Sequence, residues 1–218
     1  WDQHFGALLA ELKRRGQYDQ TTIVVTSDHG EEFMDHGGYW HGTTLYDEAL
    51  HVPLFVKLPA SRLGGSVLSH PVQSIDLLPS LLSASGLPIP AGVQGQSLWN
   101  AHASVFAEES HEGNVLQALR VTHQGSAWKV ITANPQSPRG LAPLELYHVQ
   151  ADPHEQLNLA ETALDTARAT QRALAEEQAG AARGRVTQRA LNIAEDSVTL
   201  ERLRALGYAG GDEEGHAN

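Results

Sequence analysis

The sequence contains no cysteine, which excludes disulfide bonds but leaves the cellular compartment open. Basic residues are also scarce, since 15 Lys and Arg stand against 26 Asp and Glu and give a net charge of −11. That balance argues against a nucleic-acid partner, whose phosphates need a basic face. It does not argue against an anionic substrate, because local charge rather than the total governs a binding site. No apolar run approaches the length of a membrane span.

Two short hydrolase motifs are incomplete or absent. A zinc-protease helix needs a second histidine four residues after the first, but Val115 follows His111 and Asn158 follows His154 at that spacing. The phosphate-binding loop G-x-x-x-x-G-K is missing as well. With 41% hydrophobic and 19% charged residues, the composition is that of an ordinary globular protein, and 218 residues suit one or two domains.

The segment 21–58 carries the clearest chemical signal. A β-branched run over 21–26 predicts a strand buried on both faces, and it ends in Ser27-Asp28-His29-Gly30. Adjacent residues on a regular strand point to opposite faces, so Asp28 and His29 can share one ion only if the backbone leaves the pleat there. Gly30 permits that turn. Two more imidazoles, His36 and His41, follow in the next loop, so we expect a metal site at this strand end.

The remaining elements are predicted from periodicity and from turn residues. We expect a helix over 2–15 that stops at Gly16, a second buried strand over 52–58, and a helix over 74–84. Pro79 lies in the middle of that last helix and predicts a kink or a late start. The loop-like stretch 86–95 is a plausible domain boundary.

Beyond residue 100 the pattern changes to short alternating strands. They predict a small antiparallel sheet and cover residues 104–108, 116–122, 127–132 and 145–149. Helices are expected from about 160 to 179 and over 193–206, followed by a disordered tail. The predicted domains are therefore 1–100, 101–160 and 161–218.

Several of these pieces, taken in order, resemble the sulfatases of the alkaline-phosphatase superfamily. The matching motifs are TSDHGEE (26–32), WHGTTLYDEALHVPLFVKLP (40–59), SIDLLPSLLSASGLPIPAGVQGQSLW (74–99), ALRVTHQGSAWKVI (118–131), LELYHVQADPHEQLNLA (144–160) and LRALGY (203–208). The resemblance implies an α/β fold, in which an alkaline-phosphatase-like sheet flanked by helices is joined to a small C-terminal antiparallel sheet with helices. Residues 1–100 would then be the C-terminal part of the catalytic domain, 101–160 the antiparallel subdomain, and 161–218 a helical tail.

The family pattern also shows what this chain lacks. Sulfatases carry their nucleophile in an N-terminal C/S-x-P-x-R motif, with two metal-binding aspartates upstream of it. Here Ser137-Pro138-Arg139 has the wrong spacing, and the chain opens at Trp1 inside an apparent helix. We therefore expect the C-terminal half of a sulfatase, inactive alone and poorly soluble, whose main partner is its missing N-terminal half.

Residue roles follow from the resemblance. Asp28 and His29 match metal ligands, and the cofactor would be one divalent ion. Calcium is the commonest in the family, but the imidazole of His29 also suits Mn²⁺ or Zn²⁺, with Mg²⁺ a further candidate. His41 occupies the position of a family Lys or His beside the sulfate, where it could contact a sulfate oxygen or protonate the departing alcohol.

Other polar residues in the same motifs have less specific interpretations. His36 has no clear counterpart in the family and would at most lie at the substrate rim. Glu31, Glu32 and Asp35 are expected on a solvated face. A structural turn is expected from Tyr147, Asp152, Pro153 and Asn158, and packing from LRALGY (203–208).

The implied reaction is metal-dependent hydrolysis of a sulfate monoester to an alcohol and sulfate, with a formylglycine nucleophile made from Cys or Ser. The main alternative is a phosphonate or phosphate monoester hydrolase, or a phosphotransferase, of the same superfamily. A second alternative is an inactive truncated chain. The sequence does not identify the substrate, and it leaves both a periplasmic or secreted and a cytoplasmic location open.

Overall fold

The computed structural model describes residues 1–111 and 113–183. The predictions of a helix over 193–206, of a disordered tail and of packing by LRALGY (203–208) lie outside the described residues. The predicted domain boundaries at 100 and 160 remain predictions. Among the described helices, none is long and apolar enough to cross a membrane.

The N-terminal part begins with helix α1 (Asp2–Arg14), close to the predicted span. Gly16, which follows the C-cap residue Arg15, has a φ of +66°, a left-handed conformation that glycine adopts without steric cost. A 3-10 turn, η1 (Tyr18–Gln20), leads into strand β1 (Ile23–Thr26). None of the α1 side chains is buried within the described part of the chain.

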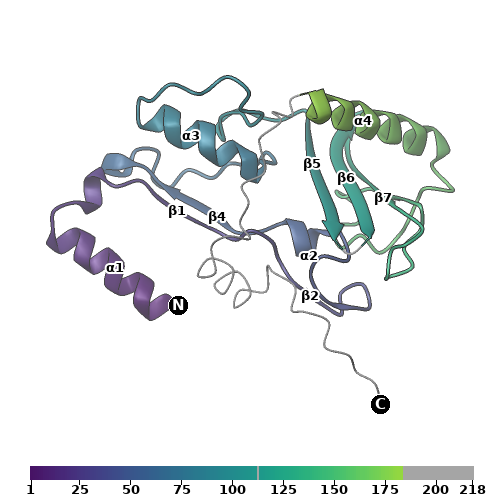
Figure 1. Cartoon of the computed structure of the whole chain (residues 1–218), viewed down its shortest axis with the longest axis horizontal. Helices are drawn as coiled ribbons and strands as arrows, with labels where there is room; N and C mark the ends of the chain where they lie inside the picture. The colour runs from purple at the N-terminus through teal and green to yellow at the C-terminus, as the bar shows by residue number, and fades with distance from the viewer. Residues whose placement is uncertain (112, 184–218) are drawn as a thin grey trace, which may run out of the picture. The chain divides into compact units, whose positions relative to one another are not determined.

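Strand β1 pairs in antiparallel fashion with β4 (Leu54–Lys57), with Val24 opposite Val56 (Figure 1). The prediction that β1 is buried on both faces is wrong for the described residues, because its side chains are half-buried and Thr26 is exposed. The physical reason is that β4 is the only strand next to β1 within the part that the structure describes. A 3-10 turn, η2 (Pro59–Ser61), follows β4.

Between β1 and β4 lies the segment that carries the candidate site. It contains the short strands β2 (Glu32–Phe33) and β3 (Tyr39–Trp40) and helix α2 (Asp47–Leu50). β2 and β3 form a hairpin with only two residue pairs. We call residues 29–41 the histidine loop, because it runs from His29 to His41.

Helix α3 (Leu77–Ala84) follows a 3-10 turn, η3 (Ser74–Asp76). Pro79 therefore lies in the first turn of α3, where its missing N–H leaves no intrahelical hydrogen bond unmade. The late start was one of the two outcomes that Pro79 predicted. The buried carboxylate of Asp76 accepts hydrogen bonds from the backbone N–H groups of Gln73 and Gln96, both at 2.9 Å, and lies 2.6 Å from His102 Nε2.

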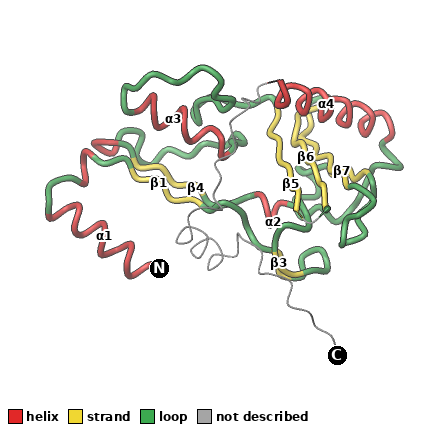
Figure 2. Tube along the Cα trace, in the orientation of Figure 1, coloured by secondary structure: helices red, strands yellow, loops and turns green. Residues whose placement is uncertain are grey.

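The predicted antiparallel sheet is confirmed. Strands β5 (Ser104–His111), β6 (Asn114–His123), β7 (Ser126–Ala133) and β8 (Leu144–Tyr147) pair in sequence order. Figure 2 shows the first three side by side. Gln124 and Gly125 join β6 to β7 with φ values of +50° and +78°, as a tight two-residue hairpin turn requires. Helix α4 (Leu164–Arg183) covers residues where a helix was expected.

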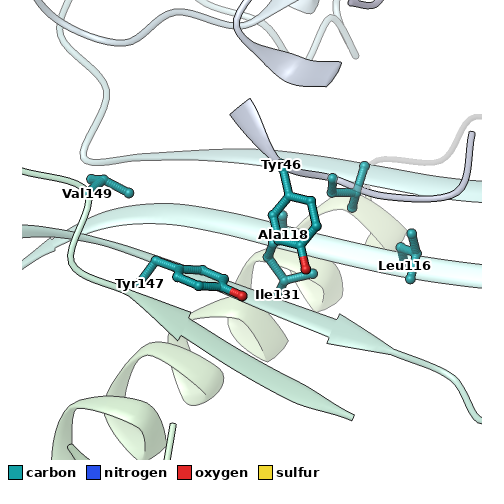
Figure 3. Packing of buried hydrophobic residues seen from close by; sticks show 7 residues of the cluster. Tyr46, Leu116, Ala118, Ile131, Tyr147 and Val149 are labelled. Atoms are coloured by element: carbon teal, nitrogen blue, oxygen red, sulfur yellow. The ribbon is translucent and has the colours of Figure 1, made fainter. Parts of the chain in front are cut away.

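The two faces of this sheet bury different partners, because side chains alternate along each strand. One face packs against α4 through Leu119, Val130, Leu146, Ala167 and Leu174. The opposite face receives Leu45 and Tyr46, which pack on Leu116, Ala118, Ile131, Tyr147 and Val149 (Figure 3). Since residues 45 and 46 come directly after the histidine loop, the second face of the sheet fixes one end of that loop.

Candidate active site

The chain leaves the pleat immediately after β1, as the sequence required. The Ser27 hydroxyl donates to the His29 carbonyl at 2.6 Å, and the His29 N–H donates to Asp28 Oδ1 at 3.1 Å. These local hydrogen bonds form a tight turn of the kind that Asp and Ser side chains stabilise. The turn brings the side chains of residues 28 and 29 to the same side.

Gly30 is needed here for space rather than for a left-handed backbone. A Cβ at this position would lie 1.9 Å from the Glu48 carbonyl oxygen. The Gly30 N–H donates to the Ala49 carbonyl at 2.8 Å, and the Glu31 N–H to the Glu48 carbonyl at 3.1 Å. Helix α2 therefore holds the backbone of the turn directly.

Asp28 and His29 lie close together, with 3.8 Å between Asp28 Oδ2 and His29 Nε2. His29 Nδ1 is 2.8 Å from the Gly30 carbonyl oxygen, which can only accept, so Nδ1 carries the proton. In the neutral ring, Nε2 then presents a lone pair toward the carboxylate, which is the arrangement that histidine metal ligands adopt. Two facing acceptor atoms at this distance fit a shared divalent cation.

These two side chains are not a complete ligand set. Among residues 1–111 and 113–183, no group of three or more His, Asp or Glu side chains is arranged to hold a metal ion. Two ligands leave most of the coordination sphere of a divalent cation unfilled. Tight binding therefore needs further ligands.

His41 joins the pair from the other end of the histidine loop. Its ring stacks on that of His29, with 4.0 Å between the centroids and 25° between the planes. The side chain is about half exposed, at 48%. The candidate catalytic residue and one candidate metal ligand are thus in van der Waals contact.

Glu31 is a site residue that the sequence interpretation missed. It was expected on a solvated face, but its side chain is only 31% exposed and its Oε1 atom lies 3.2 Å from His41 Nδ1. A carboxylate beside one ring nitrogen fixes the orientation of an imidazole and favours a proton on that nitrogen. The sequence contained one signal for this contact, because Glu31 directly follows the turn and lies in the same loop as His41.

The expectation of a solvated face is also wrong for Glu32, whose side chain is fully buried. Both of its oxygens lie 2.9 Å from the guanidinium of Arg139, which lowers the pKa of Glu32 below its ordinary value. Asp35 is exposed, as expected, and accepts from the Phe33 N–H at 2.9 Å. The Arg139 guanidinium is thus paired with Glu32, a contact that the wrong spacing of Ser137-Pro138-Arg139 for the family motif did not predict.

His36 points into the protein rather than toward a substrate rim. Its Nδ1 lies 2.5 Å from Glu48 Oε1, its Nε2 lies 3.1 Å from the Glu155 carbonyl oxygen, and its ring stacks on Tyr46 at 3.6 Å. Burial disfavours the charged ring, but Glu48 and the Glu155 carbonyl outweigh it, so the pKa of His36 is raised. His36 therefore fastens the loop to the structure beneath it.

Helix α2 is held in turn by a buried ionic cluster. Lys129 Nζ, on β7, lies 2.8 Å from Asp47 Oδ1 and 2.7 Å from Glu155 Oε1. Glu155 Oε2 also accepts from the Asp47 N–H at 2.7 Å, at the first residue of α2. The turn residues predicted to be structural include Asp152, which accepts from the Leu157 N–H at 2.8 Å, and Asn158, which accepts from the Leu146 N–H at 3.1 Å.

Comparison with known proteins gives consistent matches. Residues 1–87 match the family model described as Sulfatase. Arylsulfatase K from Homo sapiens is 28% identical over 176 residues, and N-acetylglucosamine-6-O-sulfatase from Bacteroides thetaiotaomicron is 34% identical over 97 residues. These alignments span 73% and 44% of this chain but only 31% and 17% of the two relatives. The chain thus spans less than a third of the length of the curated relatives it matches.

Solved structures show the same fold. The structure of BT4656 in complex with D-glucosamine-2-N,6-O-disulfate aligns with a TM-score of 0.66 at 23% identity, over 84% of this chain and 38% of that one. The structure of yidJ from Bacteroides fragilis, itself a proposed sulfatase, aligns with a TM-score of 0.61 at 21% identity, over 81% of this chain and 39% of that one. The predicted α/β fold of the alkaline-phosphatase type, with its small C-terminal antiparallel sheet, is confirmed.

The raised pKa of His36 predicts a pH-dependent contribution to stability. A histidine whose pKa is raised in the folded state stabilises that state fully below its ordinary value of about 6.5, and the effect is lost as the pH rises through the raised value. His36→Asn should therefore lower the midpoint of thermal unfolding more at pH 6 than at pH 9. His123→Asn, at the β6–β7 turn outside this network, is the control. A decrease in the unfolding midpoint of His36→Asn that is the same at both pH values, or larger at pH 9, contradicts the prediction.

Proposed function

We propose that the chain belongs to the sulfatase family, whose model matches residues 1–87, and that it supplies part of the active site of a sulfuric ester hydrolase. The reaction converts a sulfate monoester to an alcohol and sulfate. The observation that carries this proposal is the convergence of three residues at the end of β1: Asp28 lies 3.8 Å from His29, and the His41 ring stacks on His29 at 4.0 Å. A relative named N-acetylglucosamine-6-O-sulfatase favours a sulfated sugar as the substrate class.

Asp28 and His29 would hold one divalent cation, together with further ligands that residues 1–111 and 113–183 do not group around them. Such an ion, when bound, neutralises charge on the sulfate oxygens and favours the ionised nucleophile. The protonated Nδ1 of His29, fixed by the Gly30 carbonyl, leaves Nε2 available as a ligand. A nitrogen ligand suits Mn²⁺ or Zn²⁺ more than Ca²⁺, while the carboxylate of Asp28 suits all of them as well as Mg²⁺.

His41 would act on the sulfate group or on the leaving alcohol. Glu31 accepts from Nδ1, so the imidazolium form directs its other proton, on Nε2, away from Glu31. That proton can be donated to a sulfate oxygen or to the departing alkoxide, where negative charge increases as the S–O bond breaks. Glu31 is then the residue that orients the His41 ring.

His41→Ala in the full-length protein should lower kcat for an alkyl sulfate by about 10²–10⁴-fold while KM changes much less, because the contact strengthens in the transition state. Glu31→Gln keeps an oxygen acceptor and removes the negative charge, so it should lower kcat by less than His41→Ala does. His123→Ala is the matched control and should leave kcat unchanged. Steady-state kinetics with a poor leaving group provides the measurement, and an unchanged kcat in His41→Ala would show a structural role.

The proposal as a whole is tested by separating this chain from the rest of its protein. Residues 1–218 alone should turn over no sulfate ester, because the proposed nucleophile and further metal ligands lie elsewhere. The chain alone should also aggregate, because large apolar side chains such as Trp1 and Phe55 are 78% and 68% exposed.

Co-expression with the N-terminal segment that this proposal requires should restore both solubility and hydrolysis of an aryl sulfate. Clear hydrolysis of an aryl sulfate by purified residues 1–218, with the activity lost in Asp28→Ala, would contradict the prediction that this chain is inactive alone. A restored protein that cleaves phosphonate or phosphate monoesters but not sulfate esters would contradict the sulfatase proposal and favour phosphoryl transfer on the same fold.

A further inference from the structure

Arg139 reaches from the β7–β8 connection into the middle of the histidine loop. Its Nη1 and Nη2 atoms each lie 2.9 Å from an oxygen of the buried Glu32, in a two-pronged ion pair between residues 107 positions apart in sequence. Nη2 also donates to the His36 carbonyl at 2.9 Å. One guanidinium therefore binds both a side chain and the backbone of the loop.

Glu32 extends this contact to the second half of the loop and beyond it. Its Oε1 also accepts from the Gly38 N–H at 2.9 Å, and its Oε2 from the Thr44 hydroxyl at 3.2 Å. Every oxygen of this buried carboxylate thus has two partners, one of them Arg139. The pair ties residues just after His29 to residues on both sides of His41.

The hairpin within the loop cannot supply this order by itself. β2 and β3 share only two residue pairs, and a short two-stranded hairpin is marginal in water. Its side chains also pack little, since Phe33, Tyr39 and Trp40 are 71%, 58% and 73% exposed. The contact between the His29 and His41 rings therefore needs support from outside the hairpin.

We propose that Arg139 is a positioning residue that holds the histidine loop closed and thereby keeps His41 stacked on His29. This inference rests on the proposed function, because it assigns Arg139 a role in placing the group that acts on the sulfate. Arg139 lies outside the motifs that resemble the sulfatases, so its role follows from the contacts alone.

Gly38 gives an independent way to disturb the same contact. A Cβ on Gly38 would lie 2.1 Å from Arg139 Nη1, and the backbone of Gly38 is not left-handed, so only space requires a glycine there. Gly38→Ala would therefore push the guanidinium away from Glu32 without removing any charge. Arginine is also needed for its planar fork, because the single nitrogen of lysine cannot make the two parallel hydrogen bonds that a guanidinium makes to a carboxylate.

A purely stabilising ion pair is the competing explanation. Buried ion pairs often contribute little net stability, because desolvation offsets the attraction. A positioning role predicts an effect on kcat and on the order of residues 30–44, whereas a stabilising role predicts only a lower temperature of unfolding. These outcomes can be separated in the full-length protein.

The test compares Arg139→Ala, Arg139→Lys and Gly38→Ala with two matched controls. Arg14→Ala removes an exposed arginine on α1 that lies 2.6 Å from Glu11. Gly6→Ala adds a methyl group on α1 where nothing lies within 4 Å. The measurements are kcat and KM for a sulfate ester, the temperature of unfolding, and hydrogen exchange of peptides that cover residues 30–44.

We expect kcat to fall by about 10- to 100-fold in all three loop variants, with a small change in KM, because a displaced catalytic group costs that much. Exchange over 30–44 should become faster in the same variants and stay unchanged in both controls. Added guanidinium should restore part of kcat in Arg139→Ala only. Wild-type kcat and exchange in Arg139→Ala and Gly38→Ala would overturn the proposal, as would an equal loss of kcat in Arg14→Ala.

Failure of the proposed function gives a different result. A full-length protein without sulfate-ester hydrolysis would overturn the sulfatase proposal, and with it the role of Arg139 in that reaction. Hydrogen exchange needs no turnover, so faster exchange over 30–44 in the loop variants would still support the structural half of the proposal. Unchanged exchange would overturn that half as well.

Discussion

The buried ammonium group of Lys129 fixes the position of the whole site. A lone charge inside a protein is costly, so Lys129 has to keep Asp47 and Glu155 beside it, at 2.8 and 2.7 Å. Asp47 opens helix α2, and the carbonyls of Glu48 and Ala49 in that helix accept from the N–H groups of Glu31 and Gly30. The ammonium group of Lys129 on β7 therefore holds helix α2 in place, and α2 in turn holds the backbone next to His29.

The C-terminal sheet and the segments that follow its strands thus support the site from outside the loop. Tyr46 packs on one face of the sheet, His36 binds the Glu155 carbonyl, and Arg139 binds Glu32. All three contacts hold the histidine loop, whose own hairpin is too short to order itself. This division explains how Asp28 and His29, just after β1, can lie beside His41 at the other end of the loop, with the loop supplying the chemistry and the sheet supplying rigidity.

Sequence reasoning succeeded where the signal was local. Alternating side chains predicted the four strands of the antiparallel sheet, Pro79 predicted the late start of α3, and the turn at Ser27–Gly30 predicted that Asp28 and His29 could meet. It failed where the determining partner is remote. Glu32 looked like a solvated carboxylate because Arg139 lies 107 residues away, and β1 looked buried on both faces because β-branched composition does not say how many strands flank it. No local pattern contains either fact.

The central claim is that Asp28 and His29 share one cation beside His41. Anomalous diffraction from crystals of the full-length protein soaked in Mn²⁺ tests it most directly. The account predicts a peak about 2.0–2.6 Å from both a carboxylate oxygen of Asp28 and Nε2 of His29, with the His41 ring still stacked on His29. A peak bound by other residues, or no peak between these two side chains at saturating Mn²⁺, would contradict it.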